Sequence, residues 1–99
     1  MLHIVNKSHT ERNALVSCLR LARDGQSLLL IEDGVLAAAA ATAEASGIAA
    51  AARRLKVYVL VPDAQARGMA ARLAPEVTGV DYAGFVDLVA GHSTNQSWL

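Results

Sequence analysis

Short apolar runs alternate along the chain with stretches in which apolar residues recur at helical spacing. The runs at 2–6, 27–31, 56–61 and 77–80 have the length and the aliphatic character of strands. The run at 27–31 is apolar almost throughout, which is typical of a strand buried on both faces and therefore central in a parallel sheet. The pattern predicts four strands, with the second of them in the interior.

Helices are predicted in the intervals between these strands. Ser8, with Glu11 three residues later, forms the pattern of a capping box and predicts a helix over 11–23. The alanine-rich stretch 35–52 predicts two helical pieces with a break near Gly47.

Two more helices follow the third and fourth predicted strands. Pro62 and Asp63 start a short helix, and Asp81 caps a helix that ends at Gly91. Strand and helix thus alternate four times with short connections, the pattern of right-handed βαβ units. We expect one α/β domain over 1–99, a three-layer α/β/α sandwich with a mostly parallel sheet of four to five strands.

The composition indicates a protein with partners. Hydrophobic residues make up 54% of the chain, charged residues 18%, and the formal net charge is zero, which leaves little charge to cover a small monomer. No Lys/Arg run is longer than Arg53-Arg54, so direct nucleic-acid binding is not expected. Polar residues follow the first five positions, and no apolar run has the length of a membrane span. We expect a cytoplasmic protein with no membrane segment.

The strand ends do not form a recognisable catalytic or cofactor site. The first strand-to-helix turn, 6–11, contains no glycine, so neither a dinucleotide fingerprint nor a phosphate-binding loop is present. Four carboxylates follow strands, but each stands where a helix N-terminus favours an acidic residue, so capping is the preferred interpretation: Glu32, Asp33, Asp63 and Asp81. No cofactor is predicted. No metal site is predicted either, because the histidines lack metal-ligand spacing: His3, His9 and His92.

Cys18 is the only cysteine and the only candidate site residue. A thiol carries sulfur as a persulfide when it is exposed and largely ionised. Here the neighbours at helical spacing, among them Ala14, Leu15 and Ala22, are apolar and raise the pKa of a thiol. A buried structural cysteine is favoured over a reactive one on these grounds. The terminal Trp98-Leu99 is expected to dock, either on the chain's own sheet or on a neighbouring subunit.

Several blocks together resemble the DsrH/TusB family of sulfur-relay proteins, over essentially the whole chain. These blocks are 1–8, 30–35, 56–60 with Asp63 and 66–68, Asp81-Tyr82 with Phe85-Val86, and Trp98. The likeness is closer to the DsrH branch, in which a cysteine of the first helix corresponds to Cys18. The resemblance implies a five-stranded, DsrEFH-like fold, with the tail near 96–98 as an extra edge strand.

The resemblance also implies partners. It predicts a heterohexamer with DsrE-like and DsrF-like subunits, two copies of each chain, which passes persulfide sulfur to or from a DsrC-like or TusE-like carrier. In the DsrH setting this serves sulfur oxidation, which we take as the first interpretation; in the TusB setting it serves 2-thiolation of the wobble uridine of tRNA. The catalytic DsrE-like subunit has a cysteine just after its third strand, whereas 61–64 here contains none. The main relay thiol is therefore expected on a partner, with Cys18 as a candidate accessory sulfur acceptor.

Two other classes of function remain open. An independent small-molecule enzyme that uses the strand-end carboxylates lacks an evident pair of nucleophile and base. A homo-oligomeric binding module without a redox role would leave Cys18 inert. We therefore expect a non-catalytic or accessory subunit.

Overall fold

The sheet has five strands, all parallel, in the order β4-β3-β2-β1-β5. The computed structural model describes residues 1–11 and 13–98. The strands are β1 (Leu2–Val5), β2 (Ser27–Leu30), β3 (Lys56–Leu60), β4 (Thr78–Val80) and β5 (Asn95–Trp98). The prediction of an α/β fold with a central second strand is confirmed, because β2 lies in the middle of the sheet and all four of its residues are buried.

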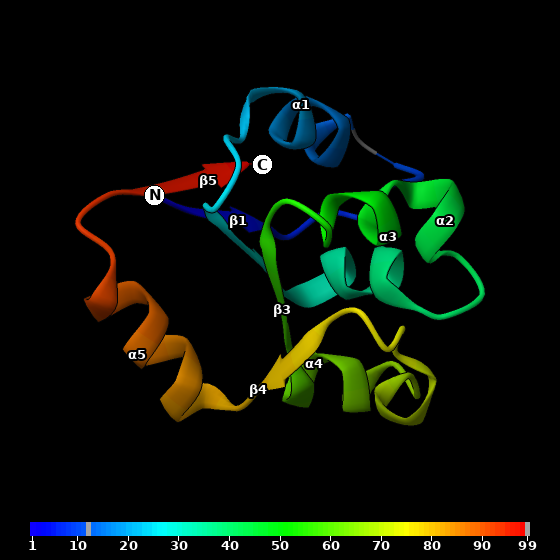
Figure 1. Ribbon diagram of the computed structural model, residues 1–99. Coiled ribbons are helices and arrows are strands. Elements are labelled where there is room, and N and C mark those ends of the chain that lie inside the picture. The colour runs from blue at the N-terminus through cyan, green and yellow to red at the C-terminus, as the bar shows by residue number, and fades with distance from the viewer. Residues whose placement is uncertain (12, 99) are drawn as a thin grey trace.

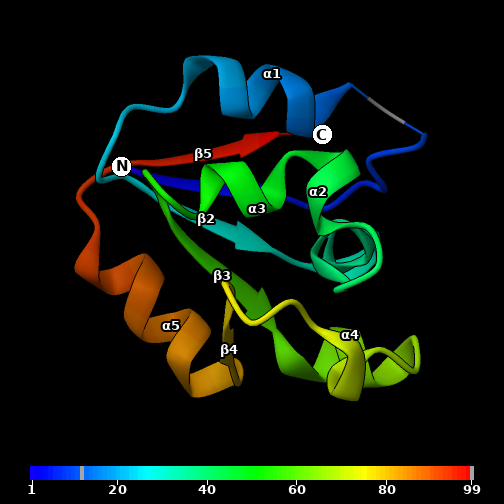
Figure 2. The same ribbon diagram turned by 45° about the vertical axis from the view of Figure 1, so that its right-hand side comes forward.

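Helical segments connect the strands and lie on both sides of the sheet (Figure 1). They are α1 (Ala14–Leu21), the 3₁₀ helix η1 (Glu32–Ala38), α2 (Ala43–Ser46), α3 (Ile48–Ala51), α4 (Val61–Ala66), the 3₁₀ helix η2 (Ala70–Arg72) and α5 (Tyr82–Gly91). Figure 2 shows α1, α2 and α3 together on one side of the sheet and α5 on the other. None of the helices in the described part of the chain is long and apolar enough to cross a membrane.

The main core lies between the sheet and the layer that contains α1 and α3. Successive residues of a strand point to opposite faces, so Leu28 and Leu30 of β2 point to this core and Leu29 points to the side of α5. Leu15 and Ile48, from α1 and α3, complete the core on the helix side. All five of these side chains are fully buried.

The predicted capping box is wrong. The Ser8 hydroxyl accepts a hydrogen bond from the backbone N–H of Thr10, and the N–H of Glu11 bonds instead to the Ser8 carbonyl. These bonds form a turn, and α1 begins at Ala14 with Asn13 as its N-cap. The serine competes for the local backbone through a short-range turn, which the capping-box pattern cannot exclude.

The alanine-rich stretch is divided into more pieces than predicted. It contains most of η1 together with α2 and α3, and the predicted break is present at Gly47, whose φ of 88° lies in the left-handed region. Gly47 ends α2 as a left-handed C-cap and starts α3. The high helix propensity of alanine therefore does not produce one long helix here.

The C-terminal segment forms the predicted extra edge strand, β5, beside β1. The indole Nε1–H of Trp98 donates to Nδ1 of His3 at 3.1 Å, so Trp98 docks on its own sheet. Because an indole N–H only donates, this bond leaves the His3 proton on Nε2, which donates to Oε1 of Gln26 at 2.8 Å. This network connects the two ends of the described chain. The predicted docking of the terminus also included Leu99, which lies outside the described residues.

Candidate functional site

Cys18, the predicted site residue, lies on the inner face of α1 and has no exposed surface. Burial raises the pKa of its thiol to about 12, and the positive charge of Arg54 lowers it by a smaller amount. The thiol is therefore protonated at neutral pH and shielded from solvent. Both properties are the opposite of what a sulfur-accepting cysteine requires.

Arg54 fixes the helix that covers this thiol. Its guanidinium donates to the carbonyl of Ala22 at 2.7 Å and to the carbonyl of Leu19, and it forms an ion pair with Asp24 at 3.5 Å. Carbonyls in the last turn of a helix have no partner within the helix, and a cation there also complements the helix dipole. Arg54 therefore anchors the C-terminal end of α1 and keeps Cys18 beneath it.

Three of the four carboxylates at the strand ends have partners among the described residues: Asp33, Asp63 and Asp81. The Asp63 carboxylate accepts a hydrogen bond from the backbone N–H of Glu32 at 2.6 Å, and Nε of Arg67 donates to Asp33 at 2.8 Å. Asp81 accepts from the N–H of Gly84 at 2.8 Å, which is the predicted cap of α5. These bonds favour structural roles over an acidic catalytic site, but the capping prediction is met only by Asp81. Asp63 binds a turn of another segment, and Asp33 pairs with Arg67.

The turn after β2 is fixed by close backbone packing. Glu32 has φ of 49°, in the left-handed region, and its N–H is held by the carboxylate of Asp63. Gly34 lies against the end of β1: a Cβ atom at this position would be 2.3 Å from the carbonyl oxygen of Val5. Only glycine fits this contact, and the turn leaves no cradle for a ligand at Gly34.

The β1–α1 connection holds two buried polar atoms without a hydrogen-bond partner among the described residues. They are Oδ1 of Asn6 and Nδ1 of His9. The amide oxygen of Asn6 is an acceptor, whereas Nδ1 of His9 donates or accepts according to the tautomer of the ring, so the two atoms do not by themselves define a ligand. No cluster of potential metal ligands occurs in residues 1–11 and 13–98, and the histidines are dispersed, with His92 bonded to Leu88 and Ser27.

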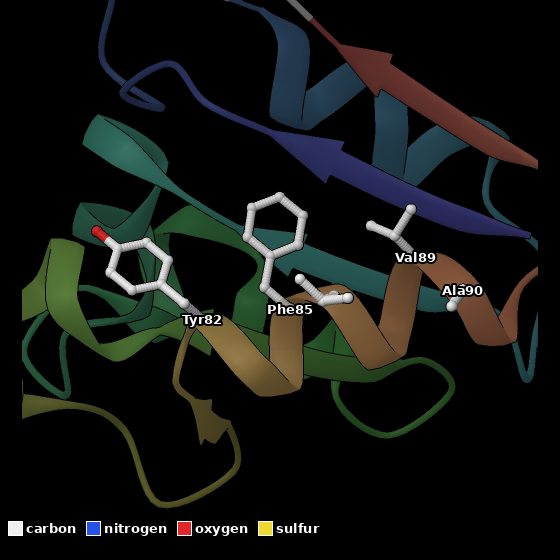
Figure 3. Close-up of a pocket in the computed structure, with 5 residues that line it drawn as sticks. Tyr82, Phe85, Val89 and Ala90 are labelled. Carbon is white, nitrogen blue, oxygen red and sulfur yellow. The ribbon is translucent and has the colours of Figure 1, made fainter.

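An apolar groove runs along α5 on the other side of the sheet (Figure 3). It has a volume of about 480 Å³ and is lined by Tyr82, Phe85, Val86, Val89 and Ala90. No residue of α5 is buried, and the side chains of Tyr82 and Val86 are 61% and 65% exposed. The sequence predicted this helix, and the structure shows that its apolar side is open to solvent.

Comparison with known proteins identifies the family. Residues 7–95 match the family described as "DsrH like protein". The chain belongs to the DsrH/TusB family. Proteins named TusB from Escherichia coli O81 (strain ED1a) and from Escherichia coli O6:K15:H31 (strain 536 / UPEC) are each 37% identical to this chain. In both cases the similarity covers 99% of this chain and 100% of the relative.

A third relative in the DsrH/TusB family is TusB from Serratia proteamaculans (strain 568), which is 35% identical over 99% of this chain and 100% of its own. The solution NMR structure of protein Tm0979 from Thermotoga maritima has the same fold, with a TM-score of 0.63 and 23% identity over 95% of this chain and 97% of that one. The family prediction is confirmed. These relatives carry the TusB name, and the expected closeness to the DsrH branch stays a prediction.

Proposed function

We propose that this chain is a subunit of a cytoplasmic sulfur-relay complex that acts in the 2-thiolation of tRNA wobble uridine. The observation that carries the proposal is the full-length similarity to TusB proteins, at 35–37% identity. This similarity favours the tRNA-thiolation alternative over the sulfur-oxidation function that we placed first from the sequence.

The expected partners are TusC-like and TusD-like chains and a TusE-like sulfur carrier. Exposed apolar side chains support an assembly of several chains, because a small monomer rarely leaves such residues in groups on its surface. They occur on both sides of the sheet: Val16 and Leu21 of α1 are 50% and 66% exposed, and Tyr82 and Val86 of α5 are exposed as well.

Within this complex we propose that the chain has a non-catalytic, accessory role. Burial of Cys18 and the raised pKa of its thiol support a packing function for this side chain. The thiol that carries sulfur then belongs to a partner subunit, since the segment after β3 has no cysteine. The alternative prediction, Cys18 as a sulfur acceptor, requires α1 to move away from the sheet against the anchoring bonds of Arg54.

The test of the function is complementation of an Escherichia coli strain that lacks TusB. Plasmid-borne expression of this chain, alone and together with the TusC-like and TusD-like chains of its own source, should restore 2-thiouridine in tRNA, measured by mass spectrometry of nucleosides. An empty vector is the control. If 2-thiouridine is not restored by any combination, although the chains form a complex, the proposed pathway is refuted and sulfur oxidation is favoured.

The role of Cys18 is tested by intact-mass analysis after the reconstituted complex is exposed to a persulfide donor. We expect a partner to gain sulfur and this chain to remain unmodified, in the native form and in Cys18→Ser alike. One added sulfur on the native chain only, removed by reductant, would show that Cys18 is a carrier.

A further inference from the structure

His3 is a buried titratable side chain that has no part in the proposed sulfur relay. It lies in β1, is only 3% exposed, and points to the side of α1, as Val5 does two residues later. Both nitrogens of its ring are hydrogen-bonded, Nδ1 to the indole of Trp98 and Nε2 to the side chain of Gln26. The ring therefore joins β5 to the turn between α1 and β2.

Two independent contacts keep the proton of this ring on Nε2. The indole N–H of Trp98 only donates, so Nδ1 of His3 accepts from it, at 3.1 Å. On the other side, Oε1 of Gln26 accepts the backbone N–H of Arg23 at 2.9 Å, which identifies this atom as the oxygen of the amide. Nε2 of His3 donates to the same oxygen at 2.8 Å. The two bonds of the ring can exist together only while His3 is neutral.

Protonation of His3 is incompatible with one of these bonds. A protonated imidazole donates through both nitrogens and accepts through neither, so Nδ1 would direct an N–H at the N–H of Trp98. The bond to Gln26 persists in this form, whereas the bond to Trp98 is lost. Within residues 1–11 and 13–98 the indole N–H has no other hydrogen bond, so the half-buried Trp98 would retain an unpaired donor if it stayed in place.

The surroundings of His3 provide no counter-charge for a protonated ring. The elements packed against β1 at this point are β2, β5, α1 and the turn at 22–26. β2 and β5 have no titratable side chain, whereas α1 and the turn contribute Cys18, Arg20, Arg23 and Asp24. Asp24 is the only carboxylate among them, and its side chain is 83% exposed and pairs with Arg54 instead. The charge of a protonated His3 would therefore be buried without a partner, which is unfavourable.

We propose that protonation of His3 releases β5 from the edge of the sheet. β5 pairs with one strand only, β1 (Figure 2), and Trp98 is its only residue that is not exposed. The docking of β5 is fully present while His3 is neutral and weakens as pH falls through the range in which histidines titrate, about pH 6.5. Release leaves β1 as the edge strand, with unpaired backbone N–H and C=O groups that can bind another strand.

The other two histidines are matched controls, because their hydrogen bonds do not require a neutral ring. Nδ1 of His92 lies 2.6 Å from the carbonyl oxygen of Leu88, and Nε2 lies 3.2 Å from the hydroxyl of Ser27. A carbonyl and a hydroxyl both accept, so protonated His92 keeps both bonds. Nδ1 of His9 has no partner among the described residues, so a proton on this atom breaks no bond.

The experiment is NMR spectroscopy of the full-length chain between about pH 7.5 and about pH 5.5, a range in which histidines titrate and carboxylates do not. It measures hydrogen exchange of the amides bonded between β1 and β5, corrected for the intrinsic effect of pH, together with the signals of the His3 ring and the Trp98 indole. We expect exchange of these amides to become about tenfold faster at the lower pH. The amides of β2 should stay protected, and the indole signal should change with the same midpoint as the His3 ring.

Three single variants assign the effect to one residue: His3→Gln, His9→Gln and His92→Gln. Glutamine keeps an acceptor for Trp98 but does not ionise, so β5 of His3→Gln should stay protected at both pH values, whereas the other two variants should respond as the native chain does.

The same pH dependence in all three variants would overturn the proposal. Two results on the native chain alone would also overturn it, so the test does not depend on the folding of His3→Gln. One is protonation of the His3 ring with no change in the indole signal or in the exchange of the β5 amides. The other is a ring that stays neutral down to about pH 5.5, one unit below the usual histidine range, with β5 protected throughout.

Discussion

The buried thiol of Cys18 predicts a specific loss of stability at alkaline pH. In the unfolded chain the thiol ionises with an ordinary pKa of 9.0, whereas in the folded chain burial holds the pKa at about 12. Between these values the unfolded state binds fewer protons than the folded state, so the free energy of unfolding falls as pH rises. The contribution is fully present below pH 9 and is lost progressively up to pH 12.

The size of the effect follows from the difference between the two pKa values. Each pH unit in this window lowers the free energy of unfolding by about 1.4 kcal/mol through Cys18 alone. Other groups titrate in the same range, so the difference between the native chain and Cys18→Ala isolates this contribution. We expect the native chain to lose ~1.4 kcal/mol more than Cys18→Ala between about pH 8 and pH 10.

The assay is urea unfolding at both pH values, in the presence of a phosphine reductant, followed by the fluorescence of Trp98, the only tryptophan. Ser17→Ala is the matched control, since it changes a neighbouring residue of α1 without removing a thiol, and it should lose as much stability as the native chain. Equal losses for the native chain and Cys18→Ala would refute the burial of the thiol. So would rapid reaction of the native thiol with a disulfide reagent near neutral pH.

Three further variants test the packing that fixes the site. Gly34→Ala should destabilise the fold by about 3 kcal/mol because of overpacking. Gly91→Ala is the control and should not destabilise it, because no atom lies within 4 Å of the added Cβ. The midpoints of thermal unfolding of the two variants are compared with that of the native chain. Arg54→Met should lower the free energy of unfolding by roughly 2 kcal/mol, since it leaves carbonyls at the end of α1 without their charged donor, and equal urea midpoints for variant and native chain would contradict this. Trp98→Phe removes the hydrogen bond to His3 and should speed hydrogen exchange of the β5 amides while those of β2 stay protected; unchanged exchange in β5 would show that the indole does not hold the strand.

The candidate site was only partly predictable from the sequence. The apolar neighbours of Cys18 at helical spacing indicated a buried thiol, because residues three and four positions apart share one face of a helix. The anchoring of α1 by Arg54 had no such signal, since the two segments are 32 residues apart along the chain. The sequence did not reveal the open groove for a related reason. Apolar residues on a helix indicate that the helix packs against something, but not whether another part of the same chain covers them.

Local patterns in the sequence determined the elements of this protein. Continuous apolar runs produced the strands, the run at 27–31 identified the central one, and Asp81 marked the start of α5. The family resemblance supplied the fifth strand, β5, whose polar sequence has no strand pattern of its own.

Only the tertiary structure decided how completely the elements cover one another. Whether a side chain is buried depends on where the connecting helices cross the sheet, and this path is set by contacts between residues far apart in the chain, such as His92 with Ser27. The same physics places Cys18 beneath an anchored helix and leaves Val86 in solvent, although both are apolar residues on helices beside the same sheet. Hydrophobic spacing determines which face of a helix is apolar, and the packing of the whole chain determines whether another element covers that face.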